Sequence, residues 1–541
     1  MIVGRLLPDV SPCSHWSRRQ TIVAEASHAS TKPKQGAGQK QRAIVIGGGI
    51  GGITLAAKLA KMGDGLQVTL LEQNEQVGGR CQSMYTETRK GIFRFDTGPS
   101  LLLFPGIYQE TFASLGVQLE ERVPIHRVSP AVYRVWFEPQ GAPNPSAVQQ
   151  ADEHMASPVP AFAHPRNGGY LDLLYDIVEM RAQLDAVEEG AGRAYLAWLS
   201  KARTALEVGL REFIQRDFDS IFDFLDLRRL LPLLTQVDIA ELLGQHHQRL
   251  ASRFNDPRLQ ALFSFQDLYV GLSPYTAPGV FSLLAATEIT DGVFYPMGGF
   301  QQVKQALADV AEELGVEIRT SERIVRVNTV SSQQGLKSSH RATGVLLENG
   351  EELSADVVIS NRGEESWKRA RRADELLPRP NFYVHCPTRT DPTAAPEGCE
   401  SIMVLLPVAN LQEVHAADGG KQAEGLDGDS EADLVAAGRE AIARTFREEG
   451  VCEDLWGHVL HQTVIGPREW KRRYSIEHGA VFGLSHGLSQ LAIFRPGAKT
   501  EVDGFYLVGA SARPGNGVPL VMISADLTAK RVLHDLGSSQ N

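Results

Sequence analysis

The sequence predicts an α/β fold in which a nucleotide-binding strand–helix–strand unit is interleaved with an α+β region. An apolar run from Ala43 to Ile46, a helix from Gly49 to Met62 and a second apolar run from Gln67 to Leu71 form this unit, about 30 residues long. Near the other end of the chain, a strand from Phe505 to Val508 precedes another helix. Residues 171–286 read as mostly helical, because their apolar side chains recur every three to four positions.

Composition limits the classes of function that the chain can have. Its 541 residues predict two or three domains, or one large interleaved fold. With 54 Lys and Arg against 65 Asp and Glu, the net charge is −11, which argues against nucleic acid as a partner. The five cysteines are scattered without a CxxC spacing, so neither a disulfide framework nor a metal site is expected. No apolar run approaches the roughly 18 residues of a spanning helix, but peripheral membrane contact stays open.

Residues 1–42 are predicted to be a targeting or disordered segment. They contain seven Lys and Arg against two acidic residues, with Ser and Thr interspersed. This composition favours an organelle transit peptide, with a plain disordered tail as the alternative. We therefore expect a membrane surface in a plastid or other organelle, or else a cytoplasmic membrane surface. The leucine-rich stretch from Leu230 to Leu234 is either a membrane-dipping surface or interior packing.

The segment after the first strand satisfies the GxGxxG pattern. Gly47 permits the tight turn, Gly49 lets the backbone approach a pyrophosphate, and Gly52 lets the helix pack closely on the strand. Glu72 follows Gly52 by 20 residues and ends the second strand, where a carboxylate accepts hydrogen bonds from ribose hydroxyls. Together these residues predict a Rossmann-type dinucleotide site.

A second glycine pair follows the acidic residue. It ends in Gly79, whose backbone N–H adds a donor for a pyrophosphate, and Arg80 adds a fixed cation. Here the sequence resembles the FAD-dependent amine oxidase and phytoene desaturase superfamily, in which such an element follows the dinucleotide fingerprint. The stretch from Phe93 to Ser100 is similar to a loop near the flavin in that family, which assigns Gly98 and Pro99 to the cofactor. The resemblance therefore implies FAD.

The C-terminal region carries the same resemblance. Gly509 ends the last strand, and Gly517 and Val518 stand at the start of a helix that runs to about Leu533. A helix N-terminus aimed at the flavin would stabilise the negative charge of the reduced ring. From the family we also carry over Ile324, whose main chain would contact adenine. Carotenoid desaturases of the bacterial and fungal type are similar here and in three further stretches: Ser273 to Gly279, Tyr295 to Gly299 and Thr390 to Gly398.

The resemblance covers Ala43 to about Leu536 and implies a Rossmann-type FAD-binding domain interleaved with an α+β substrate domain. The connector from Arg362 to Asn381 is much shorter than the segment that family members carry there, so either the substrate cavity is incomplete or the sequence reflects a faulty gene model. After residues 1–42, the expected division is FAD-binding for 43–130, 299–365 and 499–541, a helical substrate and membrane-associating region for 131–298, and a shortened substrate domain for 366–498.

The family implies a FAD-dependent carotenoid desaturase, an oxidoreductase acting on CH–CH bonds. Its substrate would be a long linear polyene such as phytoene, which loses a hydride and a proton in each step, and a quinone or O₂ would accept the electrons. The alternatives are a FAD-using carotenoid cis-trans isomerase and an inactive flavoprotein with a truncated substrate domain. The sequence identifies no catalytic residue, since His246, His247, Asp217 and Asp219 are expected on an exposed helix face.

Overall fold

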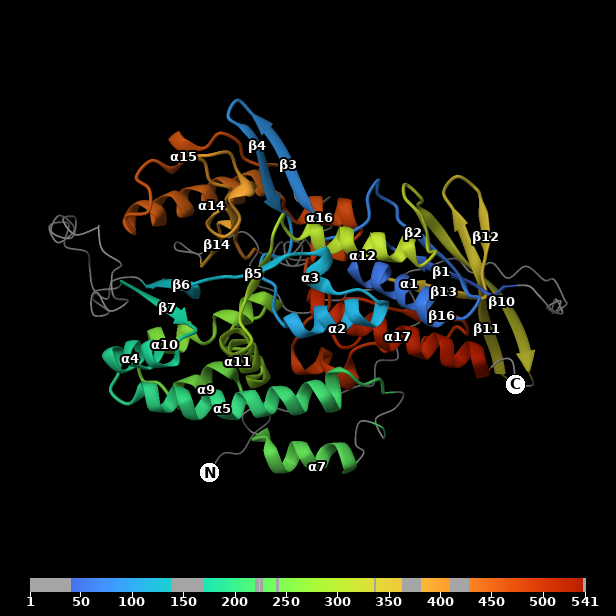
Figure 1. Ribbon diagram of the computed structural model, residues 1–541, viewed down its shortest axis with the longest axis horizontal. Coiled ribbons are helices and arrows are strands. Elements are labelled where there is room, and N and C mark those ends of the chain that lie inside the picture. Colours follow the sequence, from blue (N-terminus) through green and yellow to red (C-terminus); the bar gives the residue numbers. More distant parts are fainter. Residues whose placement is uncertain are drawn as a thin grey trace, which may run out of the picture.

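The computed structural model describes residues 40–137, 169–218, 223, 227–239, 243–334, 337–361, 381–408 and 428–538. Residues 1–39 of the predicted targeting segment and residues 362–380 of the short connector lie outside these ranges. Figure 1 shows a sheet-containing part with the strands β1, β2, β13 and β16 beside a mainly helical part with α4, α5 and α9. No helix in the described ranges combines the length and apolarity needed to cross a bilayer.

A five-stranded parallel sheet organises the first part, in the order β16-β13-β1-β2-β9. The central strand β1 pairs with β13 through Ala43 and Val357 and with β2 through Ala43 and Val68. Parallel sheets are covered on both faces, so their strands are apolar throughout. The bounds are β1 (Arg42–Ile46), β2 (Gln67–Leu71), β9 (Glu317–Arg319), β13 (Val357–Ser360) and β16 (Phe505–Leu507).

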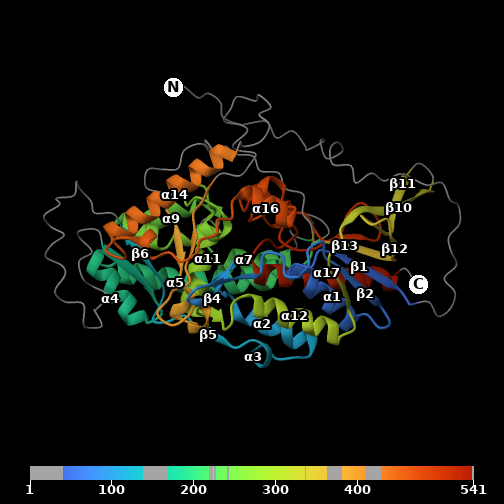
Figure 2. The ribbon, with the colours of Figure 1, turned by 90° about the horizontal axis from the view of Figure 1, so that it is seen from above.

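Helices cover one face of this sheet and an antiparallel sheet covers the other (Figures 1 and 2). On β1, Val45 joins the helical core, whereas Ile44 and Ile46 meet the antiparallel sheet, as the two-residue period of a strand requires. The α/β class predicted from the sequence is confirmed. The covering elements are α1 (Ile50–Met62), α2 (Pro105–Leu115), α12 (Gln301–Glu313) and α17 (Val518–Ser538) on one face, and β10 (Ile324–Gln334), β11 (Lys337–Leu347) and β12 (Glu352–Ser354) on the other.

The helical part has its own core around Trp198, Phe254 and Phe263, whose rings lie 5.2–5.3 Å apart in successive pairs. A two-stranded antiparallel sheet borders this core. The sheet consists of β6 (Ala131–Phe137) and β7 (Gly169–Leu174). The helices of this part are α4 (Ile177–Val187), α5 (Ala191–Gly209), α7 (Leu227–Gln236), α9 (His246–Ala251), α10 (Pro257–Leu262) and α11 (Ser282–Thr290). The short 3₁₀ helix η3 (Phe265–Val270) connects α10 to the rest of this part.

The remaining elements join these two parts. The hairpin β3–β4 follows the second glycine pair (Figure 1). The two-stranded sheet β14–β15 contacts the loop after β4, since the hydroxyl of Tyr383 on β14 lies 3.1 Å from that of Ser100. Their bounds are β3 (Ser83–Thr88), β4 (Gly91–Asp96), α3 (Leu119–Arg122), β5 (Ile125–Arg127), β8 (Phe294–Pro296), β14 (Tyr383–His385), β15 (Met403–Leu405), α14 (Gly428–Glu448), α15 (Leu455–His458) and α16 (Pro467–Tyr474).

Candidate functional site

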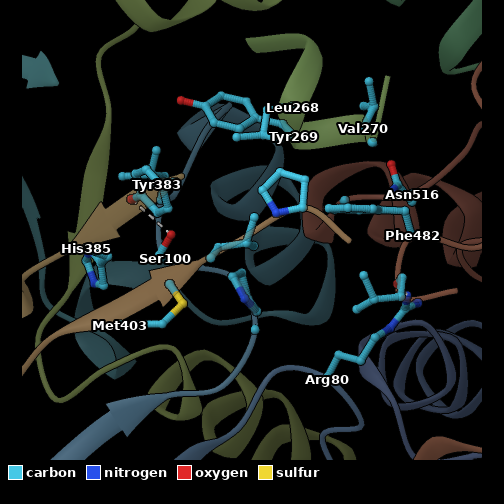
Figure 3. A pocket seen from close by; sticks show the side chains of 18 of the residues that line it. Arg80, Ser100, Leu268, Tyr269, Val270, Tyr383, His385, Met403, Phe482 and Asn516 are labelled. Carbon is cyan, nitrogen blue, oxygen red and sulfur yellow. Dashed lines mark hydrogen bonds between the residues drawn. The ribbon is translucent and has the colours of Figure 1, made fainter. Parts of the chain in front are cut away.

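A large cavity of about 3790 Å³ runs from the loop before α1 into the helical part. Figure 3 looks into a section of it, with Arg80, Phe482 and Asn516 on one side and Ser100 and Tyr383 on the other. Of the twelve residues that the sequence assigns to the cofactor, ten line this cavity: Gly47, Gly49, Glu72, Gly79, Arg80, Gly98, Pro99, Ile324, Gly517 and Val518.

The loop between β1 and α1 presents backbone rather than side chains to the cavity. Gly47 has a φ of +95°, which L side chains rarely adopt, and it turns the chain out of the strand. Gly49 is the N-cap of α1 and supplies no side chain to cap the first turn. The first N–H groups of the helix are thus available to an anion, at the positive end of the helix dipole.

The side chain of Glu72 holds this loop through hydrogen bonds to its backbone. Its carboxylate is 5% exposed, and its Oε2 accepts the backbone N–H of Gly48 at 2.7 Å. Its Oε1 accepts the backbone N–H of Asn74 at 2.9 Å. The two glycine pairs also touch, because the N–H of Gly78 donates to the carbonyl of Gly48 at 2.6 Å. The predicted ribose ligand therefore also holds the phosphate-binding backbone in shape.

Arg80 lies where the second glycine pair meets the loop after β4. Its Nη1 donates to the carbonyl of Val481, and its own carbonyl occupies the place that a Cβ on Gly98 would take. Gly98 is therefore required for this close approach of two backbones. Pro99 and Ser100 continue the loop along the cavity wall, where the hydroxyl of Ser100 lies 3.1 Å from that of Tyr383.

The start of α17 meets the start of α1 at the cavity. A Cβ on Gly51 would lie 2.8 Å from the side chain of Val521 on α17 and 3.3 Å from the Cα of Gly509, so α1 packs closely against α17 and the turn after β16. Gly517 has a φ of +100° and precedes Val518, the first residue of α17. The two helix starts from opposite ends of the chain therefore converge on one wall of the cavity.

Two of the twelve predicted residues do not line the cavity but permit this packing. A Cβ on Gly52 would overlap the carbonyl oxygen of Gly47, and one on Gly509 would overlap Oδ1 of Asn361. Asn361 itself lines the cavity directly after β13, and it is a site residue that the sequence reasoning missed. Its Nδ2 would lie 2.9 Å from a Cβ on Gly49. The available signal was its place at the carboxyl end of a parallel strand, where α/β sheets bind ligands.

The loop from Phe93 to Ser100 meets two of the stretches that resemble carotenoid desaturases, Tyr295 to Gly299 and Thr390 to Gly398, in a buried polar network. Arg94 of β4 forms an ion pair with Asp391, with 2.5 Å between Nη2 and Oδ2, and both side chains are buried. The same Oδ2 accepts the backbone N–H of Gly298 at 2.7 Å. The hydroxyl of Tyr295 donates to Oδ2 of Asp96 at 2.5 Å. This network fixes the end of β4, from which the loop of Gly98 and Pro99 departs.

The deeper part of the cavity is mainly apolar and aromatic. Its lining includes Phe265, Leu268, Val270, Met403 and Phe482. Figure 3 shows Leu268 and Val270 along one side and Met403 across the cavity from them. Such a surface stabilises a hydrocarbon by removing it from water, at about 25 cal/mol per Å².

Two of the histidines that line the cavity, His385 and His486, have lowered pKa values. Burial lowers the pKa of His385 to about 4. Burial, reinforced by the nearby Arg495, lowers the pKa of His486 to about 3. Neither imidazole is therefore a good proton acceptor at ordinary pH.

The residues that the sequence places on an exposed helix face do not share such a face in the structure. His246 is 1% exposed, because its Nδ1 lies 2.9 Å from Oδ2 of the buried Asp267 and its backbone N–H donates to Ala277. His247 packs on the ring of Tyr275, and Asp217 pairs with Arg531 at 3.2 Å. Asp219 lies outside the described residues. No local pattern indicates the pair between His246 and Asp267, since the two residues are 21 positions apart in the chain.

Comparisons with known proteins agree with this geometry. Residues 50–361 match the family model of flavin containing amine oxidoreductases. The chain is 32% identical to a phytoene desaturase of Neurospora crassa, over 91% of this chain and 84% of that protein. It is 29% identical to a zeta-carotene-forming phytoene desaturase of Myxococcus xanthus, over 92% of this chain and 94% of the other. Among solved structures, an oxidoreductase from Methanosarcina mazei shares the fold, with a TM-score of 0.50 at 17% identity, covering 90% of this chain and all of that one.

The chain belongs to the flavin containing amine oxidoreductase family, as a phytoene desaturase-like member of it. The residues present fit a flavin dinucleotide. The starts of α1 and α17 line one cavity, and α1 has no side-chain cap. The loop of Gly47 to Gly49 and the pair Gly78 and Gly79 form a cradle in which a Cβ would intrude: one on Gly49 would lie 2.9 Å from Asn361, and one on Gly79 would lie 3.1 Å from the Cα of Gly49.

Proposed function

We propose that this protein is a FAD-dependent carotenoid desaturase that acts on a long linear polyene such as phytoene. FAD, when bound, supplies the acceptor for the hydride that leaves the substrate. The observation that carries the proposal is the continuity of one cavity from the glycine cradle to an apolar interior. A polyene has no polar handle, so recognition must come from the burial of hydrocarbon in such an interior.

The cofactor assignment rests on named groups. Gly49 and Gly79 admit the pyrophosphate, Glu72 receives the ribose, and Arg80 adds positive charge beside the phosphates. The main chain of Ile324 lies at the adenine end. The start of α17 at Val518 stabilises negative charge at the far end of the dinucleotide. The choice of FAD among flavins rests on the family resemblance described above.

The proposed domain division follows the parts of the chain that supply the strands of the parallel sheet. The parallel sheet takes β1 and β2 from residues 43–130, β9 and β13 from 299–365 and β16 from 499–541. We assign these three parts to FAD binding. Residues 131–298 and 366–498 supply the walls of the substrate cavity.

The proposed route for the substrate is from a membrane surface. Leu243 and Tyr275 both line the cavity and are exposed, and Leu231 on α7 is exposed as well. An apolar rim of this kind suits peripheral contact with a bilayer that holds the polyene. Location at a membrane in a plastid or other organelle is supported by the basic composition of residues 1–42. The electron acceptor would be a quinone or O₂.

Expression in cells that accumulate phytoene tests the function. We expect more conjugated carotenoids, which absorb at longer wavelength, and none in cells that express the Gly49→Val variant. Altered isomers with unchanged conjugation would favour the cis-trans isomerase instead. An unchanged phytoene pool, with soluble flavin-loaded protein present, would favour the inactive flavoprotein.

A further inference from the structure

One aromatic residue stands where the cofactor end of the cavity meets its apolar interior. Phe482 lines the cavity and is half-buried. In Figure 3 it lies between Val270, which belongs to the apolar wall, and Arg80, which belongs to the cofactor end. A polyene whose reacting carbons reach a flavin in the glycine cradle has to pass this junction. The ring of Phe482 is therefore a surface that such a substrate meets.

A tight turn presents this ring to the cavity. The backbone N–H of Gly483 donates to the carbonyl of Ala480 at 3.0 Å, so Val481 and Phe482 occupy the two central positions of the turn. Gly483 closes the turn with a φ of +77°. The carbonyl of Val481 accepts a hydrogen bond from Nη1 of Arg80. The position of Phe482 is thus tied to the second glycine pair of the cradle.

The ring of Phe482 packs against the end of η3. A Cβ on Gly271 would lie 2.8 Å from Cδ2 of Phe482, 3.4 Å from Cε2 and 3.5 Å from Cγ. Gly271 ends η3 with a φ of +69°, and its N–H donates to the carbonyl of Leu268 at 3.1 Å. A larger residue at this position would displace the ring. Phe482 and the wall residues Leu268 and Val270 therefore form one continuous surface of fixed shape.

A conjugated chain fits such a surface better than a saturated chain does. Each desaturation makes the polyene flatter, stiffer and more polarisable. A flat and polarisable chain makes more close contacts with an aromatic face than a bent chain makes. It also loses less conformational entropy on binding, since fewer rotatable bonds remain to be fixed. Contact with Phe482 should therefore strengthen as the conjugated segment grows.

We propose, on the basis of the function inferred above, that Phe482 is a specificity-determining residue that holds the growing conjugated segment of the polyene beside the flavin. Gly271 and the turn from Ala480 to Gly483 fix its ring. Partly desaturated intermediates then bind more tightly than phytoene and are retained for the next step. Phe482 thereby sets how many double bonds the enzyme introduces.

Product analysis of the FAD-loaded enzyme acting on phytoene in phosphatidylcholine vesicles in air tests this role. Phe482→Leu keeps an apolar side chain but removes the flat face. It should consume phytoene at nearly the wild-type rate, but its products should have fewer conjugated double bonds and absorb at shorter wavelength. Phe482→Tyr keeps the ring and should keep the wild-type products. Phe494→Leu is the matched control, because Phe494 is 67% exposed and does not line the cavity, and it should also keep them.

Binding without turnover gives a second readout. With the flavin of the loaded enzyme chemically reduced and oxygen excluded, the ring cannot accept a hydride, so a polyene binds without reacting. Phe482→Leu should weaken the binding of the conjugated polyene lycopene about fivefold and that of phytoene by less. The polyene that stays on the protein after the vesicles are removed measures this binding.

Gly271→Ala tests the contact that fixes the ring. The new Cβ would overlap Phe482, so the products should shift toward fewer double bonds. The same change made in Phe482→Leu should add little, because the ring that it displaces is already gone. Gly315→Ala controls for backbone strain, since Gly315 also has a positive φ, of +89°, but a Cβ there meets open space. Its products should match those of the wild type.

Wild-type products from folded, flavin-loaded Phe482→Leu would overturn the role of Phe482 and leave the proposed function standing. Equal weakening of lycopene and phytoene binding in that variant would do the same. A flavin-loaded wild type that leaves phytoene unchanged would instead overturn the proposed function itself.

Discussion

The glycine cradle and the deep cavity differ in how their residues reach the site. In the cradle, Gly47, Gly49 and Gly79 act through backbone conformation and lie within 33 residues of one another. Behind the wall of the deep cavity, Glu288 of α11 accepts a hydrogen bond from Gln266 of η3, which also contacts Tyr133 of β6, so three elements meet there. The cradle is thus a local structure that short motifs specify, whereas the deep cavity exists only after the elements have packed. Substitutions in the two regions should therefore have different effects on flavin binding and on stability.

The largest loss of stability should come from the network that joins the two regions. Arg94→Met removes one partner of a buried ion pair and leaves Asp391 without its cation, which should cost about 3 kcal/mol or more in the free energy of unfolding. Unfolding in denaturant measures this change. The double variant Arg94→Met with Asp391→Asn should recover part of the loss, because no charge is then left buried alone.

An additive loss in that double variant would contradict the coupling of Arg94 and Asp391. It would also mean that the stretch around Arg94 and the stretch around Asp391 fold independently of each other. The flavin content of the folded fraction should fall as well, because the loop of Gly98 begins two residues after β4.

The deep cavity should show a pH-dependent stability. The folded state keeps the proton of Glu288 up to about pH 7, whereas an unfolded Glu loses it near 4.5. The stability of the wild type should therefore fall relative to Glu288→Gln as the pH rises from about 4.5 to about 7, by up to about 3 kcal/mol. Melting temperatures of the two proteins across this range measure the difference. A constant difference would mean that Glu288 titrates as an exposed carboxyl does.

The smallest effect should come from Asn361. Its Nδ2 lies 3.5 Å from the carbonyl of Gly47, so Asn361→Ala should remove a weak contact and leave the cradle in place. We expect about fivefold weaker flavin binding, equivalent to about 1 kcal/mol. Titration of the apoprotein with FAD, followed by flavin fluorescence, measures it. A loss as large as that of a cradle glycine would show that Asn361 is itself part of the phosphate site.

The sequence predicted the backbone course of the cradle because its signals are short and steric, whereas the role of its residues toward the flavin stays a prediction. The strand, the turn at Gly47 and the helix start at Gly49 follow one another directly, and Glu72 lies at the end of the next strand. The convergence of α1 and α17 was also predicted, but through the family resemblance of the C-terminal stretch rather than from periodicity.

The rest depends on contacts between residues far apart in the chain. The sequence predicts His246 on an exposed helix face, whereas Asp267 is packed against it in the fold. The sequence assigns no partner to Asp96 or Asp391, whereas Tyr295 and Arg94 lie beside them in the structure. Glu288 carries no motif at all, and only its burial among tyrosines gives it chemical meaning. Burial and pairing are properties of the packed chain, so they could not be read from local patterns.

The central claim is that the starts of α1 and α17 meet around one flavin. The most direct measurement is the visible flavin absorbance of Gly49→Val after reconstitution with FAD, compared with Gly106→Val. A side chain at Gly49 would enter the phosphate cradle beside Asn361, whereas one at Gly106 meets only open space. We predict that Gly49→Val is colourless and Gly106→Val is as yellow as the wild type. Full flavin occupancy in folded Gly49→Val would contradict the claim.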